Sequence, residues 1–239
     1  DLHGEYCWKR ADGTRNYAFA DTVVRHVDAR ELEIPYWLMT YAELCDLLID
    51  HTDFSAHNQV AAFRDVLGRL RTAEGKQLGL PRTTLDTPIF FNLAALRTEI
   101  ESMNGQVMGA SGKLINGTLT GKFDNFLMRL DSKLNDNRYD FLLKPTVRKD
   151  STSLSSLLRD FVGLGTPKAA VTVIDLSSVP FDVRPTVAAQ IGRLAFEFNY
   201  WNPEYREFPI ILMCEEAHAY IPRESESQFA GSRKSMERI

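Results

Sequence analysis

The sequence has few cysteines and no long apolar run. Its three cysteines, Cys7, Cys45 and Cys214, lie far apart in a chain of 239 residues. An odd number at this spacing excludes the disulfide framework of a small secreted protein and is typical of a chain in a reducing, cytoplasmic compartment. Every apolar run is far shorter than the about 20 residues that span a bilayer, so we expect no membrane segment.

The chain also lacks an excess of basic residues. Its formal net charge is −4, with 28 Lys and Arg against 32 Asp and Glu, which is not the overall charge of a typical nucleic-acid-binding protein. A ring-shaped protein that confines positive charge to its channel is still compatible with this balance. The contents of 44% hydrophobic and 25% charged residues predict a globular chain with a large core, in one large domain or two small ones.

Two apolar segments predict buried parallel strands toward the C-terminal end. They are AAVTVIDL, residues 169–176, and FPIILMC, residues 208–214. Both are continuous runs, as expected where helices cover both faces of a sheet. Between them, Pro185 precedes apolar residues at helical spacing, namely Val187, Ile191, Leu194 and Phe198. Strand, helix and strand in this order predict a βαβ unit, and hence a parallel sheet in an α/β fold.

The middle of the chain predicts helices instead. Apolar residues recur there at helical spacing in four segments, residues 41–49, 55–75, 92–104 and 118–134. We interpret these segments as a helical insertion in an α/β core. Around them, residues 17–29 and 33–40 predict short strands, and residues 143–153 predict a polar linker.

Carboxylates follow both strands of the expected βαβ unit. Asp175 ends one strand, and Glu215 and Glu216 come directly after the other. The carboxyl ends of parallel strands share one edge of a sheet, where ligands bind in such folds. Adjacent acids repel each other unless a cation offsets the repulsion, and Mg²⁺ prefers oxygen ligands. The pattern predicts that one acid supports Mg²⁺ while its neighbour orients or deprotonates a water. Two solvated acids that cap a turn are the alternative.

Four stretches resemble, in the same order, motifs of the HerA family of DNA-translocating ATPases. IILMCEEAHAYIP, residues 210–222, resembles the Walker B segment of that family. DLHGEY, residues 1–6, is similar to its DPHGEY motif, with Leu2 in place of the usual proline. Residues 126–143 resemble the motif that closes the family's helical insertion, and residues 172–180 resemble the strand before Walker B.

This resemblance implies a fold and a set of site residues. The fold is an α/β, RecA-like parallel-sheet ATPase core, formed by residues 1–39 and 166–239, with a helical insertion at residues 40–165. ATP and Mg²⁺ are the implied cofactors. Glu215 takes the position of the Walker B acid that supports Mg²⁺, and Glu216 takes that of the catalytic base.

Further candidates lie outside the Walker B segment. Under the resemblance, Asp1 takes the position of an acid beside the nucleotide, and Glu5 is a weaker candidate there. Arg138 is a candidate to reach the nucleotide of a neighbouring subunit, as arginine fingers do, with a surface ion pair as the alternative. A metal site that includes His3 and His218 is not expected, because no compact ligand spacing supports it. We expect His218 to orient the acidic turn by hydrogen bonding.

Two small basic groups are candidate contacts to DNA phosphates, with solvated charged faces as the alternative. They are Arg148 with Lys149, and Arg233, Lys234 and Arg238. The phosphate-binding motif G-x-x-x-x-G-K-[ST] is absent, since GASGKL at Gly109 and TGKF at Gly121 lack its spacing and its hydroxyl residue. The resemblance places this motif upstream of Asp1.

The expected function is that of an ATP-driven ring translocase on double-stranded DNA, as the resemblance implies. The family is typically hexameric and works with an effector, such as a NurA-like nuclease or a sirtuin-type NADase, in DNA-end processing or defence against phage. Two alternatives stay open at this point. One is a non-catalytic ring scaffold that organises an effector enzyme, and the other is a Mg²⁺-dependent hydrolase independent of ATP.

Overall fold

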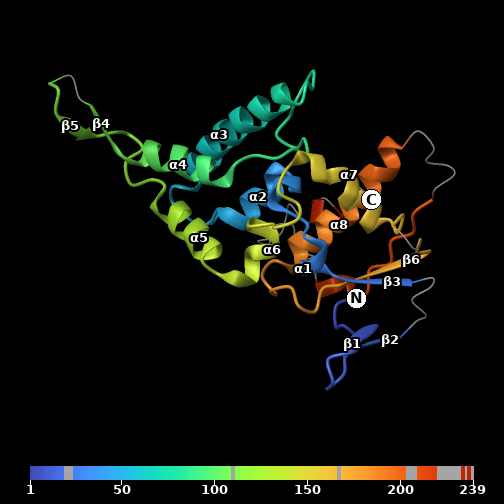
Figure 1. Ribbon diagram of the computed structural model, residues 1–239. Coiled ribbons are helices and arrows are strands. Elements are labelled where there is room, and N and C mark those ends of the chain that lie inside the picture. Colours follow the sequence, from blue (N-terminus) through green and yellow to red (C-terminus); the bar gives the residue numbers. More distant parts are fainter. Residues whose placement is uncertain are drawn as a thin grey trace. The chain divides into compact units, whose positions relative to one another are not determined.

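The contacts of the chain divide it into two compact units. The computed structural model describes all residues except 19–23, 109–110, 166–167, 203–208, 220–232, 235 and 238–239. The first unit comprises Asp1–Pro35 and Arg138–Ile239, and the second comprises Tyr36–Asn137 (Figure 1). The second unit is shorter than the expected insertion of residues 40–165, and the expected domain bounds stay a prediction.

A parallel strand pair organises the first unit. Strand β3, Val24–Asp28, pairs with β6, Val171–Asp175, in parallel register from Val24 opposite Val171 to Asp28 opposite Asp175 (Figure 1). These strands fall within the predicted segments 17–29 and 169–176, so the prediction of a parallel α/β fold is confirmed. Strand β6 is only half-buried, however, because β3 is the one strand that pairs with it in the described part of the chain.

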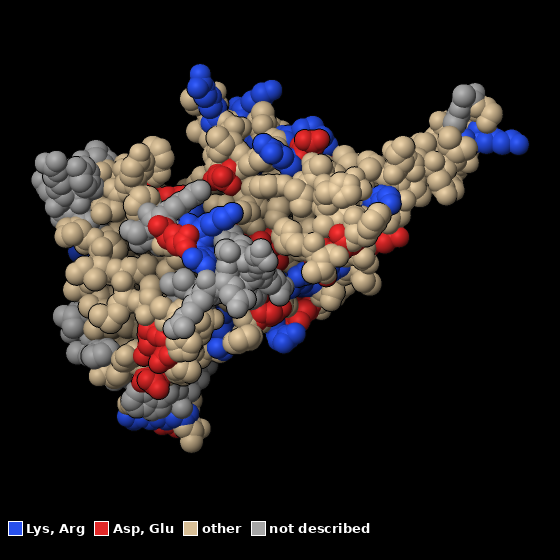
Figure 2. Space-filling model, turned by 180° about the vertical axis from the view of Figure 1, so that it is seen from behind, with Lys and Arg blue, Asp and Glu red and all other residues tan. Residues whose placement is uncertain are grey.

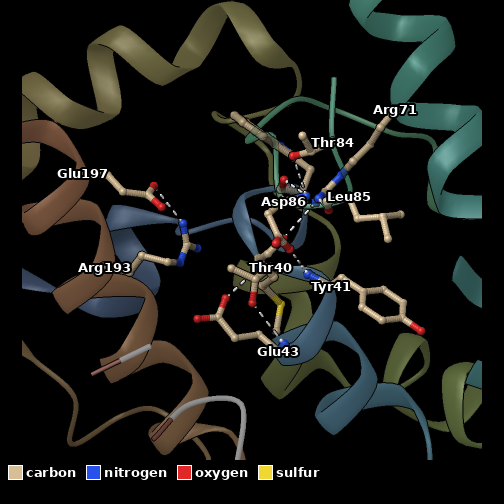
Figure 3. Close-up of polar contacts among 11 residues, drawn as sticks. Thr40, Tyr41, Glu43, Arg71, Thr84, Leu85, Asp86, Arg193 and Glu197 are labelled. Atoms are coloured by element: carbon tan, nitrogen blue, oxygen red, sulfur yellow. Dashed lines mark hydrogen bonds and ion pairs between the residues drawn. The ribbon is translucent and has the colours of Figure 1, made fainter. Parts of the chain in front are cut away.

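Helix α8, Arg184–Trp201, follows β6 as predicted. Pro185 lies in its first turn, where a missing N–H costs no helical hydrogen bond. Val187, Ile191 and Leu194 are buried, which confirms the predicted apolar face. The buried guanidinium of Arg193 binds Glu197 at 3.0 Å one turn later (Figure 3).

The second strand of the expected βαβ unit is not formed. Within the predicted strand, the structure describes residues 209–214, and these are not paired with any described strand. Ile211 is 91% exposed and Met213 is 89% exposed, whereas their neighbours are half-buried. The prediction of a buried strand at this position is therefore wrong for these residues. An apolar run becomes a strand only when a neighbouring strand satisfies its main-chain groups.

Shorter elements complete the first unit. Strands β1, Cys7–Lys9, and β2, Arg15–Tyr17, form an antiparallel hairpin. The helices are α1, Ala29–Leu32, α6, Asp140–Leu143, and α7, Leu154–Phe161, with 3-10 turns η2, Asn137–Tyr139, η3, Ser151–Ser153, and η4, Ala217–Ala219. The predicted linker, residues 143–153, is not a free connection, because Arg148 within it is buried and binds Ser156 and Asp160.

A hairpin and several helices form the described part of the second unit, and the α-helices confirm the predicted helical segments. They are α2, Tyr41–Leu48, α3, Ala56–Gln77, α4, Leu93–Asn104, and α5, Asp124–Leu134. Phe63, Leu96, Phe126 and Leu130 are almost fully buried and supply the core. The strand predicted at residues 33–40 is wrong, because Tyr36–Leu38 form the buried 3-10 turn η1. The N-cap Thr40 starts α2 directly afterwards, so the apolar run ends in a helix.

Polar contacts fix the start of α2. Thr40 and Glu43 form a reciprocal capping box, with the Thr40 N–H donating to Glu43 Oε2 at 2.8 Å and the Glu43 N–H donating to Thr40 Oγ1 at 3.2 Å (Figure 3). The N–H of Tyr41 donates to Asp86 at 2.8 Å. These contacts satisfy main-chain donors that lack a partner within the helix.

The hairpin of β4, Gln106–Met108, and β5, Leu114–Asn116, differs from the helices in its burial. All six strand residues are exposed, among them the apolar Val107, Met108, Leu114 and Ile115. Figure 2 shows this arm as mostly uncharged surface with a basic group near its end. In the part of the chain that the structure describes, no helix is both long and apolar enough to cross a membrane.

Candidate active site

The candidate site lies where β6 ends. Asp175 is the last residue of this strand, and its carboxylate accepts a hydrogen bond from the Ser177 N–H at 2.8 Å. Asp1 lies beside the same strand end, because its main-chain nitrogen donates to the Ile174 carbonyl at 3.0 Å and its carbonyl accepts from the Leu176 N–H at 2.7 Å. This is the hydrogen-bond pattern of parallel strands, so residue 1 pairs with the end of β6.

The carboxylate of Asp1 organises the loop that follows it. Oδ1 accepts hydrogen bonds from the N–H groups of His3, Gly4 and Glu5 at 3.3, 2.9 and 3.2 Å. Oδ2 accepts one from the N–H of Tyr6 at 3.2 Å. One side chain thus fixes the conformation of the whole segment 1–6. The expected role of Asp1 beside a nucleotide stays a prediction, and the structure adds this loop-holding role.

Gly4 lets the loop approach Asp175. Its φ is +70°, a conformation that is strained for residues with a Cβ atom. A Cβ added at this position would lie 3.0 Å from Ser177 Oγ and 3.4 Å from Asp175 Oδ2. The glycine therefore meets two requirements at once, a left-handed turn and close contact with the strand end.

Glu215 is held by the same loop. The N–H of Leu2 donates to Oε2 of Glu215 at 3.3 Å, and the hydroxyl of Tyr6 donates to Oε1 at 3.3 Å. The negative charge of Glu215, together with this hydrogen bond, raises the pKa of Tyr6. The structure thus brings Glu215 to the loop and strand end that also carry Asp1 and Asp175, as the sequence predicts.

Glu216 has a different environment from Glu215. Its φ is +49°, which is uncommon for a residue with a side chain. Its carboxylate lies 3.2 Å from Nδ1 of His218, and its carbonyl accepts from the Ala219 N–H at 2.8 Å. The expected contact of His218 with the acidic turn is therefore present. Strained main chain of this kind costs about 1–3 kcal/mol and occurs often at functional sites.

The described residues fit a single carboxylate contact to Mg²⁺ better than a metal cage built from protein ligands. Among residues whose placement is described, no group of three His, Cys, Asp or Glu side chains is arranged to hold a metal ion. The oxygens of Asp1 are bonded to main-chain N–H groups instead. Magnesium often binds through one or two carboxylates while it keeps several waters and substrate phosphates, and Glu215 could supply such a contact.

Among the remaining candidates, only the main chain of Glu5 contacts this cluster in the part of the chain that the structure describes. Glu5 is an exposed residue of the loop, and its N–H donates to Asp1. Arg138 is exposed in η2, and its role at a neighbouring subunit stays a prediction. Arg233 pairs with Glu237 at 2.6 Å, whereas Arg238 lies outside the described residues. Arg148 is buried and its guanidinium binds Ser156 and Asp160, so both a contact to DNA phosphates and a solvated basic face are wrong for this residue.

Three contributors to the site were not predicted as site residues. They are Gly4, Tyr6 and the N–H of Leu2, all within the DLHGEY segment. The motif itself was a signal for Gly4 and Tyr6. The contact of the Leu2 N–H was not visible in the sequence, because only folding brings residues 2 and 215 together.

Comparison with known proteins supports the resemblance. The family model described as "Helicase HerA, central domain" matches residues 1–195. The match includes the loop of residues 1–6, strand β6 and most of α8, and it ends before Glu215. A search of the curated proteins finds no match to the chain.

Proposed function

Because the chain belongs to the HerA central-domain family, a family of ATPases and translocases, we propose that it is part of an ATP-driven motor that moves double-stranded DNA. The observation that carries this proposal is the meeting of Asp1, Asp175 and Glu215 at the end of a parallel strand. This edge is the usual ligand site of parallel α/β sheets.

We assign separate roles to the two adjacent acids. Glu215 is half-buried and accepts two hydrogen bonds, so it is suited to hold a hydrated Mg²⁺ in a fixed place. Glu216 is directed to His218 and is more exposed, which suits a base that orients a water. When bound, Mg²⁺ would neutralise charge on the nucleotide phosphates.

The assembly and its partners are part of the same proposal. A ring of identical subunits, with six as the expected number, would place DNA in a central channel and the nucleotide between neighbours. Arg138 would act there across the subunit boundary, because it is exposed in η2. The proposed effector is a NurA-like nuclease or a sirtuin-type NADase.

The deciding experiment is ATP hydrolysis by the full-length protein, with and without double-stranded DNA. The test variant is Glu216→Gln, and Glu101→Gln on the surface of α4 is the matched control. Hydrolysis that DNA stimulates, and that only Glu216→Gln abolishes, supports the motor with Glu216 as its base.

Other outcomes point to the alternatives. If an assembled complex with its effector hydrolyses no ATP, the chain acts as a ring scaffold. If Mg²⁺ alone supports nuclease or phosphatase activity, the chain is a metal-dependent hydrolase. Either result would reject the motor.

A further inference from the structure

Both oxygens of the Glu215 carboxylate are bound by groups from the N-terminal loop. Tyr6 donates its hydroxyl to Oε1, and Leu2 donates its main-chain N–H to Oε2, each at 3.3 Å. Two donors at different oxygens restrict rotation of a carboxylate as well as its position. Hydrogen bonds that involve an ionised group are also stronger than those between neutral groups.

The two donors are themselves held in place. The Tyr6 N–H donates to Asp1 at 3.2 Å, and the Tyr6 carbonyl accepts from the Ala18 N–H at 2.9 Å. Leu2 is only 6% exposed, so the adjoining main chain is anchored by packing. A fixed loop can therefore impose an orientation on Glu215, whose own segment, residues 209–214, has no paired strand among the described residues.

We propose that the Tyr6 hydroxyl and the Leu2 N–H form a clamp that orients the Glu215 carboxylate, which makes Tyr6 a positioning residue for the reaction. This inference rests on the proposed function, in which Glu215 supports Mg²⁺. The donor at position 2 depends on the residue there. Leucine has a main-chain N–H, whereas the proline that is usual in the similar DPHGEY motif has none. The clamp replaces the support that a paired strand would give to the acid that follows it.

The first test compares Tyr6→Phe with Tyr200→Phe in the full-length protein. Both changes remove one hydroxyl, but Tyr200 is exposed on α8 and makes only ring contacts with Phe196 and Trp201 in the described structure. We expect Tyr6→Phe to lower kcat about tenfold, as the loss of one hydrogen bond to a charged group implies, with KM for ATP changed less than about twofold. Tyr200→Phe should keep wild-type kinetics.

The second test detects the clamp by a measurement that does not depend on ATP hydrolysis. Amide hydrogen exchange, followed by mass spectrometry, should become faster in peptides that cover residues 209–219 in Tyr6→Phe and stay unchanged in Tyr200→Phe. Leu2→Pro removes the other donor, and Leu2→Ala removes the packing but keeps the N–H. The clamp predicts a larger increase in exchange for Leu2→Pro than for Leu2→Ala.

The outcomes separate this proposal from the proposed function. If the wild type hydrolyses ATP but Tyr6→Phe matches Tyr200→Phe in both kcat and exchange, the clamp is overturned and the motor stands. If the wild type hydrolyses no ATP, the motor fails, and the exchange comparison still decides the clamp. Faster exchange with Tyr6→Phe supports it, and unchanged exchange rejects it.

Discussion

The carboxylate of Glu33 accepts three hydrogen bonds from Thr146, a residue 113 positions later in the chain. The Thr146 N–H lies 3.0 Å from both carboxylate oxygens, and the Thr146 hydroxyl lies 2.6 Å from one of them. The N–H groups of Val147 and Arg148 donate to the same carboxylate at 2.7 and 3.1 Å. One residue that is 8% exposed thus joins the end of α1 to the loop after α6.

This junction predicts that Glu33→Gln is strongly destabilising. The neutral amide keeps the shape of the side chain, but it replaces one acceptor oxygen by a donor that faces N–H groups. We expect the free energy of unfolding to fall by about 3 kcal/mol, measured by urea denaturation. The exposed neighbour Glu31→Gln serves as the control and should change stability by less than about 0.5 kcal/mol. Similar losses for the two variants would refute the importance of the junction.

The junction also predicts sensitivity to acid. Burial raises the pKa of Glu33, but the hydrogen bonds from Thr146, Val147 and Arg148 outweigh burial and leave it below the ordinary value of 4.5. A lowered pKa stabilises the fold above the unfolded-state pKa, and this stabilisation is lost as the pH falls through the folded-state pKa. We therefore expect wild-type stability to fall more steeply below about pH 4.5 than that of Glu33→Gln. Parallel pH profiles of the two unfolding free energies would contradict this.

Substitution of Gly4 tests the candidate site and separates the effect of main-chain strain from the effect of a steric contact with Ser177. Gly4→Ala forces a Cβ atom to within 3.0 Å of Ser177 Oγ at a φ of +70°. Gly13→Ala is a matched control, because its φ is +84° and no atom lies within 4 Å of the added Cβ. Strain costs each variant about 1–2 kcal/mol, and we expect only Gly4→Ala also to displace the loop and reduce ATP hydrolysis. Equal activity of the two variants would show that the loop tolerates the displacement.

Arg71 is expected to be the most sensitive polar residue of the helical unit. It is fully buried, and its guanidinium donates to the carbonyl of Leu85 (Figure 3). The guanidinium also donates to the carbonyls of Trp37 and Met39, and it lies 5.3 Å from the centre of the Phe91 ring. Arg71→Met leaves these carbonyls without that donor, and we expect a loss of about 3–4 kcal/mol in thermal or chemical unfolding. Arg64→Met, exposed on the same helix α3, should cost less than about 1 kcal/mol.

The sequence predicted the helical part of the fold well, because few structures other than a helix produce apolar periodicity over ten or more residues. It also located β6 and α8, where a continuous apolar run is followed by Pro185 and an amphipathic face. Short apolar runs were less informative. Residues 33–40 became a 3-10 turn and a helix start, since a run of this length fits a buried helix end as well as a strand.

The candidate site was predictable in part for the same reason. The sheet edge could be inferred for Asp175, which ends the parallel strand β6. Glu215 lies near the same edge, but contacts with residues 2 and 6 place it there and not the expected strand before it. The contacts of Tyr6 and Leu2 with Glu215 span 209 and 213 positions, so no local pattern encodes them. Likewise, Glu33 was not singled out, since its partners lie in a loop that reads as an ordinary polar linker.

The β4 and β5 hairpin should be dispensable for the stability of the helical unit. All of its strand residues are exposed, and a lone two-stranded hairpin is only marginally stable in water. Replacing residues 106–116 by a short Gly-Ser connection keeps Gly105 and Gly117, which contact Thr120 through the Gly105 carbonyl and the Gly117 N–H at 2.9 and 2.8 Å. We expect the unfolding free energy to change by less than about 1 kcal/mol.

A core substitution provides the reference for a large loss of unfolding free energy in the same assay. Phe126→Ala removes a side chain that is 1% exposed and packs against Phe63 with ring centres 5.9 Å apart. A cavity of this kind costs about 3–5 kcal/mol. If the hairpin deletion approaches that loss, the exposed strands support the helices after all. If stability is kept, the apolar side chains of the hairpin contribute little to the unit that carries them.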